Sequence, residues 1–244
     1  MLLYFVSGLA LAQDLKVVTE HLPPYNFIEG GKLTGYSTEL LQLILKELQL
    51  NPEIQVLPWS RAFQMATERN NVLIYTIARS KERDPNFEWI GPIASRKIVL
   101  LKLEQRKDIQ INSLWDFQSN PGARSYKIGI VRELASSQKI LSDELIPHNQ
   151  LDAAPTTESN LKKLLLGRVD MIVGDEAGTQ YELKNGLKDK TKLSTVAVVD
   201  AQIAFYFAIK KGSDPILVLR LKQAFEKIKA TNAQTELKQK YELN

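Results

Sequence analysis

Short apolar, β-branched runs alternate with amphipathic runs along this chain, and this alternation limits the folds open to it more than any other feature. Residues 38–48 carry apolar side chains at the i, i+3, i+4, i+7 spacing of an amphipathic helix, and Ser37 is placed to cap it. The segments predicted over the first third of the chain are, in order, a strand at 15–19, this helix, a strand at 54–56, a helix at 60–67 and a strand at 72–77. Strands that alternate with helices in this way predict a mostly parallel sheet.

The same alternation begins again after this first unit. Strands are predicted at 97–101, 127–131, 169–173, 195–199 and 203–209, and helices at 137–145, from a cap at Ser159 to a stop at Gly167, and from Asp214-Pro215 onward. The last helix is predicted to bury a stripe formed by Leu217, Leu221, Ala224, Phe225 and Ile228. Two units of about 115 residues each suit two small α/β lobes better than one large sheet, and the cleft between the lobes is then the expected binding site.

The residue types that the chain lacks exclude several kinds of site. It has 244 residues, no cysteine and two histidines, so disulfides, thiolate metal sites and a cysteine nucleophile are excluded, and no histidine-rich metal site is expected. The 32 lysines and arginines exceed the 28 acids by a net charge of +4, yet they are scattered along the chain rather than gathered into a stripe. We therefore expect no metal, no cofactor and no nucleic-acid partner.

The first twelve residues form an uncharged, apolar segment. Residues 1–12 end in Ala-Leu-Ala, which resembles the apolar region and small-residue cleavage site of a secretory signal peptide, although no basic segment precedes it. A buried first strand is the alternative. The run is far shorter than the roughly 20 apolar residues of a membrane span. We expect cleavage after Ala12 and export of the rest of the chain.

Five segments, spread over nearly the whole chain, carry a resemblance to a known family. They are 23–27 (PPYNF), 35–40 (GYSTEL), 80–92 (with SKER and FEWIGP), 165–176 (LLGRVDMIVGDE) and 207–212 (FAIKKG). Each segment is weakly diagnostic alone, but their order and spacing are specific. Together they resemble the extracellular solute-binding proteins of family 3, the amino-acid-binding type.

The resemblance implies a two-lobed, periplasmic-binding-protein-like fold of type II, with a mostly parallel sheet and flanking helices in each lobe. The first lobe would comprise residues 13–101 and 201–244, the second residues 102–200, and two crossing segments near Leu101 and Asp200 would form the hinge. It also implies a monomeric periplasmic protein that is not an enzyme. Such a protein captures an amino acid or a related carboxylate and passes it to the membrane permease of an ABC-type importer.

Two oppositely charged residues would hold the ligand. The resemblance assigns the ligand's α-carboxylate to Arg83, whose guanidinium can form two parallel hydrogen bonds with a carboxylate. A surface pair with Glu82 or Asp84 is the alternative for Arg83. The resemblance assigns the ligand's α-ammonium group to Asp175, which follows a predicted strand. A cap of the next helix is the alternative for Asp175. One ligand would satisfy both residues only when the lobes close.

The remaining ligand contacts are also implied by the resemblance. Tyr25 and Trp59 match the aromatic positions that sandwich the ligand, and core packing is the alternative for both. Thr76 and the backbone of Ala78 match positions that contact the carboxylate. The family's Gly-Thr pair after the strand at 127–131 is missing, and Ser136 is the expected replacement for its hydroxyl. This departure leaves a dicarboxylate, a modified amino acid or a small peptide open as the ligand.

Three further polar residues rank second as ligand contacts. Arg79 and Arg83 are four residues apart at a strand end, Arg61 belongs to a Pro-Trp-Ser-Arg variant seen in relatives, and Glu20 ends the first strand.

Two other functions remain open. One is a sensor or regulatory binding module that acts through a separate signalling protein. The other is a dehydratase-like enzyme on the same scaffold, for which Glu20, His21 and Glu176 are the candidate acids and bases. Turnover of a bound compound would separate the enzyme from a binding protein.

Overall fold

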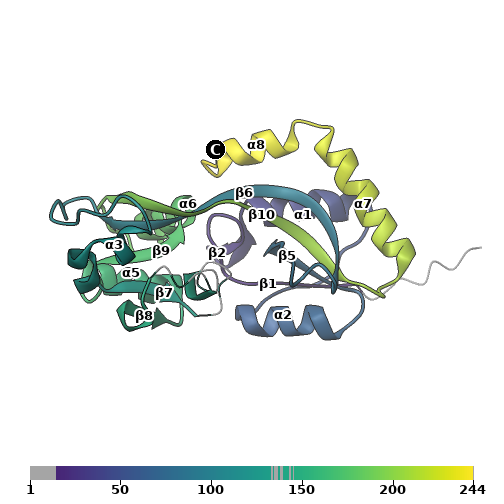
Figure 1. Ribbon diagram of the computed structural model, residues 1–244. Helices are drawn as coiled ribbons and strands as arrows, with labels where there is room; N and C mark the ends of the chain where they lie inside the picture. The colour runs from purple at the N-terminus through teal and green to yellow at the C-terminus, as the bar shows by residue number, and fades with distance from the viewer. Residues whose placement is uncertain are drawn as a thin grey trace, which may run out of the picture.

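The computed structural model describes residues 15–243 except 133, 135, 136, 138, 139, 143 and 145. The expected signal peptide and Ser136 therefore lie outside the described residues. Two groups of strands and helices are joined by two long strands, β6 (Phe87–Leu103) and β10 (Leu193–Lys210), as Figure 1 shows. One sheet runs through both groups, with the strand order β4-β1-β5-β10-β6-β9-β7-β8.

The first half of the sheet is parallel, as the alternating sequence predicts. It contains β1 (Lys16–Thr19), β4 (Ile54–Val56) and β5 (Val72–Ala78), and β1 pairs in parallel with both neighbours. Helices α1 (Tyr36–Glu47) and α2 (Trp59–Glu68) connect these strands. A hairpin of β2 (Phe27–Glu29) and β3 (Lys32–Thr34), which sequence analysis missed, lies between β1 and α1.

The second half of the sheet is also parallel within itself. Strand β7 (Ile128–Val131) pairs in parallel with β8 (Leu151–Ala154) and β9 (Met171–Asp175). The helical segments of this half that the structure describes with bounds are α3 (Asp116–Ser119), η1 (Pro121–Ser125), η2 (His148–Gln150), α5 (Thr157–Leu165), α6 (Glu176–Tyr181) and the π-helical turn η3 (Glu182–Gly186). Part of the predicted helix at 137–145 lies outside the described residues.

Strands β6 and β10 connect the two halves. They run antiparallel to each other from the pair Leu193 and Leu103 to the pair Lys210 and Phe87. Strand β10 continues the first half by pairing with β5, and β6 continues the second half by pairing with β9. The predicted strands at 195–199 and 203–209 are therefore one strand, because the irregular pairing around Asp200 bends β10 without ending it.

The C-terminal helices α7 (Pro215–Lys229) and α8 (Ala233–Lys240) return to the first half (Figure 1). The predicted start of α7 is confirmed: the Asp214 side chain accepts hydrogen bonds from the backbone amides of Ile216 and Leu217, and Pro215 occupies the first turn. Its buried stripe is also as predicted, with Ile228 partly buried at the end.

Two predicted helix caps are wrong. Ser37 lies inside α1, because the amides of Tyr36 and Ser37 donate to the carbonyl oxygens of Pro24 and Tyr25, so the first turn needs no side-chain cap. Gly35 precedes α1 with φ +111°, and a Cβ there would lie 2.4 Å from the Tyr25 carbonyl oxygen.

In α5, Thr156 takes the cap position. Its hydroxyl accepts from the Ser159 amide, while the Ser159 hydroxyl accepts from the Thr156 amide, so Ser159 is the third helical residue of a capping box.

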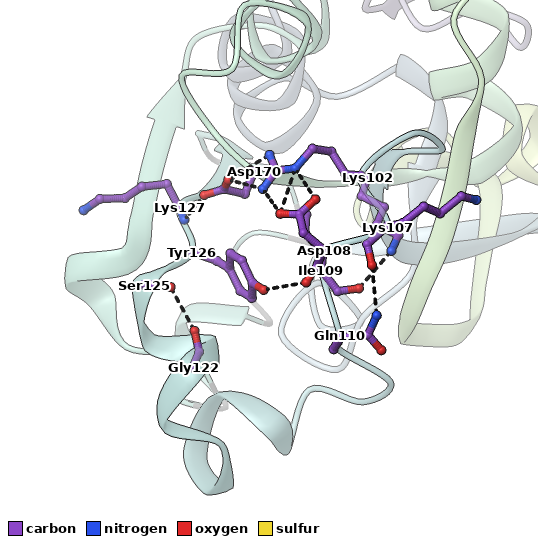
Figure 2. A network of polar contacts seen from close by, with 11 residues as sticks. Lys102, Lys107, Asp108, Ile109, Gln110, Gly122, Ser125, Tyr126, Lys127 and Asp170 are labelled. Atoms are coloured by element: carbon purple, nitrogen blue, oxygen red, sulfur yellow. Dashed lines mark hydrogen bonds and ion pairs between the residues drawn. The ribbon is translucent and has the colours of Figure 1, made fainter.

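A network of hydrogen bonds and ion pairs includes Asp108, Lys127 and Asp170 of the second half (Figure 2). The Arg106 guanidinium donates to the carboxylates of Asp108 and Asp170 at 2.8–3.1 Å, and Asp170 also accepts the Lys127 backbone amide at 2.8 Å. The network ties the segment after β6 to the residues just before β7 and β9. Its main charged groups are already paired within the protein, so it is a structural network.

Candidate functional site

A cavity of about 440 Å³ lies between the two halves of the sheet. Its first-half wall includes Glu20, His21 and Trp59, and its second-half wall includes Arg132 and Asp175. Glu20 follows β1 and Asp175 ends β9, so the carboxyl ends of parallel strands from both halves face this space. Ligand sites of α/β proteins form at these strand ends. The expected cleft between two α/β units is present.

A second, much smaller cavity of about 20 Å³ adjoins the cleft on the first-half side. It brings together five of the residues singled out by sequence, namely Glu20, Trp59, Thr76, Ala78 and Arg83. Glu20, Trp59 and a further residue, Arg96, line both cavities. The small cavity and the cleft are therefore parts of one site.

Arg83 is held against aromatic rings rather than against a carboxylate. Its guanidinium carbon lies 5.4 Å from the ring centroid of Trp59 and 5.0 Å from that of Phe63, and its Nη1 donates to the Ala78 carbonyl oxygen at 2.8 Å. Burial lowers the pKa of Arg83, and the nearby positive charge of Arg96 lowers it further. The alternative surface pair is not formed, because Asp84 binds Arg79 at 2.7 Å instead.

Thr76 is strained at this site. Tyr75 and Ile77 oppose the consecutive residues Phe207 and Tyr206 of β10, so Thr76 is the extra residue of a bulge, and its φ is +60°. Positive φ is an outlier for a β-branched residue. The Thr76 hydroxyl is buried and has no hydrogen-bond partner among the residues that the structure describes. Backbone strain and an unpaired hydroxyl gather at functional sites.

Asp175 is both a helix cap and a cleft residue. Its Oδ2 accepts from the Gly178 amide of α6 at 2.8 Å and from the Tyr25 hydroxyl at 3.4 Å. The side chain is 9% exposed, and burial raises its pKa, opposed by the positive charge of Arg96. The capping alternative for Asp175 is therefore confirmed, and the same side chain also lines the cleft.

The two aromatic candidates occupy different places. Trp59 is half-buried, stacks on Phe63 with centroids 5.6 Å apart, and lines both cavities. Tyr25 is 2% exposed, its ring meets Phe205 edge-on at 5.0 Å, and it lines a neighbouring cavity behind Asp175 instead of the cleft. Tyr25 thus contacts the site through its hydroxyl rather than through its ring.

Some of the second-rank residues line the cavities and others lie at the surface. Arg61 and Arg79 are exposed, and Arg79 is engaged with Asp84. Glu20 lines both cavities, and burial raises the pKa of its carboxyl to about 7, although Arg96 and Arg83 oppose this shift. His21 lines the cleft, whereas Glu176 lines the neighbouring cavity.

Arg96 is the site residue that sequence analysis missed. It lies on β6, is 9% exposed, and places its guanidinium carbon 4.3 Å from the ring centroid of Phe205. A sequence signal was available: Arg96 is two residues before buried Ile98, so in a strand both side chains point to the same face.

A metal-ligand cluster and a membrane-spanning helix are both absent from the described part of the chain. It contains no group of three or more histidine, cysteine, aspartate or glutamate residues arranged to hold a metal ion. None of its described helices has both the length and the apolar character needed to cross a membrane.

Comparison with known proteins assigns the chain to a family. Residues 15–244 match the model of the bacterial extracellular solute-binding proteins, family 3. The probable amino-acid-binding protein YxeM of Bacillus subtilis (strain 168) is 24% identical over 220 residues, which cover 89% of this chain and 79% of the relative.

Two solved structures confirm the predicted fold class. A histidine kinase sensor domain with similarity to periplasmic binding proteins matches with a TM-score of 0.78 at 21% sequence identity. The match covers 94% of this chain and 96% of the sensor-domain chain. An ancestral arginine-binding protein bound to glutamine matches with a TM-score of 0.77 at 19% identity, covering 93% and 96%. By the family match over nearly its whole length, the chain belongs to the bacterial extracellular solute-binding proteins, family 3.

Proposed function

We propose that this protein binds a small zwitterionic or carboxylated solute, an amino acid or a relative of one, in the cleft. Arg83 supports this most directly. Its guanidinium is half-buried, oriented by Trp59 and Phe63, and hydrogen-bonded to a carbonyl rather than to a carboxylate. A carboxylate is the group that best completes such a guanidinium. YxeM is named as an amino-acid-binding protein, and the ancestral protein of similar fold was solved with glutamine.

Binding would be coupled to closure of the cleft. In this proposal Arg83 takes the solute's carboxylate and Asp175, on the opposite wall, takes its ammonium group. Changing a mostly open population into a mostly closed one requires about 5.5 kcal/mol of differential affinity. Two charge-assisted contacts of roughly 1.5–3 kcal/mol each supply about that amount.

The physiological role would be capture for import. We propose that residues 1–12 direct export, that the remaining chain works in the periplasm as a monomer, and that it delivers the solute to the permease of an ABC-type importer. The family's extracellular character supports this location.

A sensor is the second candidate function, favoured by the similarity to a histidine kinase sensor domain. A sensor would bind the same solutes and differ in its partner. Co-purification with a permease favours import, and co-purification with a signalling receptor favours sensing.

The solute-binding proposal is tested by a thermal-shift screen of residues 13–244 against amino acids, dicarboxylates and small peptides. A solute that binds only the folded state raises Tm. For a solute found in this way, Arg83→Ala should weaken binding by about 10- to 100-fold in calorimetry. Arg79→Ala, which removes an exposed arginine four residues away, is the matched control and should bind like wild type. Equal affinity in wild type and Arg83→Ala would contradict the site, and a screen without any binder would contradict the function.

A further inference from the structure

Arg96 carries a buried guanidinium for which no ion pair is formed within the described residues. It is nine-tenths buried, and its Nε has no hydrogen-bond acceptor. Within the described part of the chain, its close contact is with the face of the Phe205 ring. Burying a charge without pairing it is costly. The cation–π contact with Phe205 offsets only part of that cost.

The two acids whose pKa the charge of Arg96 lowers, Glu20 and Asp175, form no ion pair with it. The charges of Glu20 and Asp175 act on it, yet neither carboxylate forms an ion pair with its guanidinium. Asp175 is already engaged by the Gly178 amide and the Tyr25 hydroxyl. Burial raises the pKa of Glu20 to about 7, so near neutral pH this carboxyl is protonated part of the time. The anion that would satisfy Arg96 is therefore not supplied by these side chains.

Arg83 and Arg96 approach the site from different elements. Arg83 follows β5 and lines the small cavity with Thr76, whereas Arg96 lies on β6 and lines both the small cavity and the cleft. Arg83 is fixed by Trp59 and the Ala78 carbonyl, and Arg96 by Phe205. The two guanidiniums therefore both border the small cavity, and Arg96 also borders the cleft.

We propose that Arg96 binds an anionic group of the solute, and that Arg83 and Arg96 together adapt the cleft to solutes with two carboxylates. This inference rests on the proposed function, and it names the substrate class of the same site. In this proposal a dicarboxylic amino acid places one carboxylate on each guanidinium, and its ammonium group is taken by Asp175.

The test uses matched probes that differ in one carboxylate. Calorimetry compares L-glutamate with L-glutamine, and L-aspartate with L-asparagine, on the wild-type protein and on Arg96→Met. Wild type should bind the acid of each pair about 10- to 100-fold more tightly than its amide. Arg96→Met should abolish that preference, chiefly by weakening binding of the acid. Arg79→Met, which removes an exposed arginine, should keep it.

A stability measurement separates a binding role from a structural one. Methionine keeps the packing on Phe205 and removes the unpaired charge, so solute-free Arg96→Met should have a Tm equal to or above that of wild type. A lower Tm together with an unchanged preference for the acid would assign Arg96 to the fold and overturn the inference.

The inference and the proposed function fail in different ways. If the screen finds a tightly bound solute with a single carboxylate, and Arg96→Met binds it as well as wild type does, the inference falls while the proposed function stands. If no member of the screen binds the wild-type protein, the proposed function falls as well.

Discussion

The two walls of the cleft differ in how far their polar groups are hydrogen-bonded within the protein. On the first-half wall, the Thr76 hydroxyl is buried and has no hydrogen-bond partner among the described residues, and Arg83 donates to a carbonyl oxygen alone. On the connecting strand β6, the buried Nε of Arg96 also has no acceptor among them. On the second-half wall, Asp175 already accepts two hydrogen bonds within the protein. The first wall thus keeps groups unsatisfied at a cost in stability, which is expected where a ligand completes them. On the second wall, the Asp175 carboxylate both caps α6 and lines the cleft.

A comparison of Arg106 with Arg83 shows the same difference between two arginines, one outside the cleft and one at it. The Arg106 guanidinium is paired with Asp108 and Asp170, which are labelled in Figure 2. The resulting hydrogen bonds raise the pKa of Arg106. Arg83, by contrast, has its pKa lowered by burial and by Arg96. Arg106 is thus paired with carboxylates of the chain itself, whereas Arg83 and Arg96 form no ion pair among the described residues.

The largest effect that tests this contrast is expected at Asp175. Asp175→Ala removes both the cap of α6 and the charge in the cleft, so it should lower the free energy of unfolding by about 1 kcal/mol and weaken binding of a zwitterion by roughly 10- to 100-fold. Asp175→Asn keeps a capping oxygen, so it should retain most of the stability and lose the affinity. Denaturant unfolding and calorimetry measure the two effects. If Asp175→Asn bound the zwitterion like wild type, the second wall would have only a structural role.

The next effect is a pH dependence of stability that arises from Glu20. Its pKa is raised to about 7 in the folded state from an ordinary value of 4.5, so the folded state holds the proton more tightly. The stabilisation is present below pH 4.5 and is lost as pH rises through about 7. The free energy of unfolding of wild type relative to Glu20→Gln should therefore fall by about 1–3 kcal/mol over this window. Denaturant titrations at pH 4.5, 6 and 8 check it, and parallel curves for the two proteins would refute the shifted pKa.

A smaller effect is expected from the strain at Thr76. Glycine adopts the φ of +60° freely, although it adds entropy to the unfolded chain. Thr76→Gly should raise the free energy of unfolding by about 1 kcal/mol and weaken solute binding, because the hydroxyl in the small cavity is lost. Thermal unfolding with and without solute measures both changes. A Thr76→Gly variant that was less stable than wild type would show that the bulge is not strained.

The smallest effect is expected at Arg79. Its ion pair with Asp84 is exposed, so Arg79→Met should change the free energy of unfolding by at most about 0.5 kcal/mol and leave solute affinity within about twofold of wild type. Chemical denaturation and calorimetry measure these quantities. A large loss of affinity would place Arg79 beside Arg83 in the site and remove the distinction between them.

Features fixed by neighbouring residues were predictable from the sequence. Asp214-Pro215 starts α7 as expected, and Asp175 follows its strand and caps the next helix, because both patterns act within one turn of helix. The caps of α1 and α5 were misplaced for two reasons. The carbonyl oxygens of Pro24 and Tyr25 accept hydrogen bonds from the first amides of α1, so no side-chain cap is needed there. In α5 the cap is Thr156, three residues before Ser159, because the two residues form a reciprocal capping box.

Features set by long-range pairing were not predictable in the same way. The length of β10 and the bulge at Thr76 depend on how β10 pairs with β5 and β6, which lie far away in the sequence. Arg96 escaped notice because its own strand was predicted to begin one residue later, at Lys97. Its burial follows from the pairing of β6 with β10 and from the Phe205 ring beside it.

The most direct test of the central claim is a crystal structure with a solute identified in the thermal-shift screen. The account predicts the solute's carboxylate on the Arg83 guanidinium in the small cavity, with the opposite end of the molecule toward Asp175. A solute bound outside the cleft, or one in the cleft that leaves Arg83 hydrogen-bonded only to the Ala78 carbonyl, would contradict it.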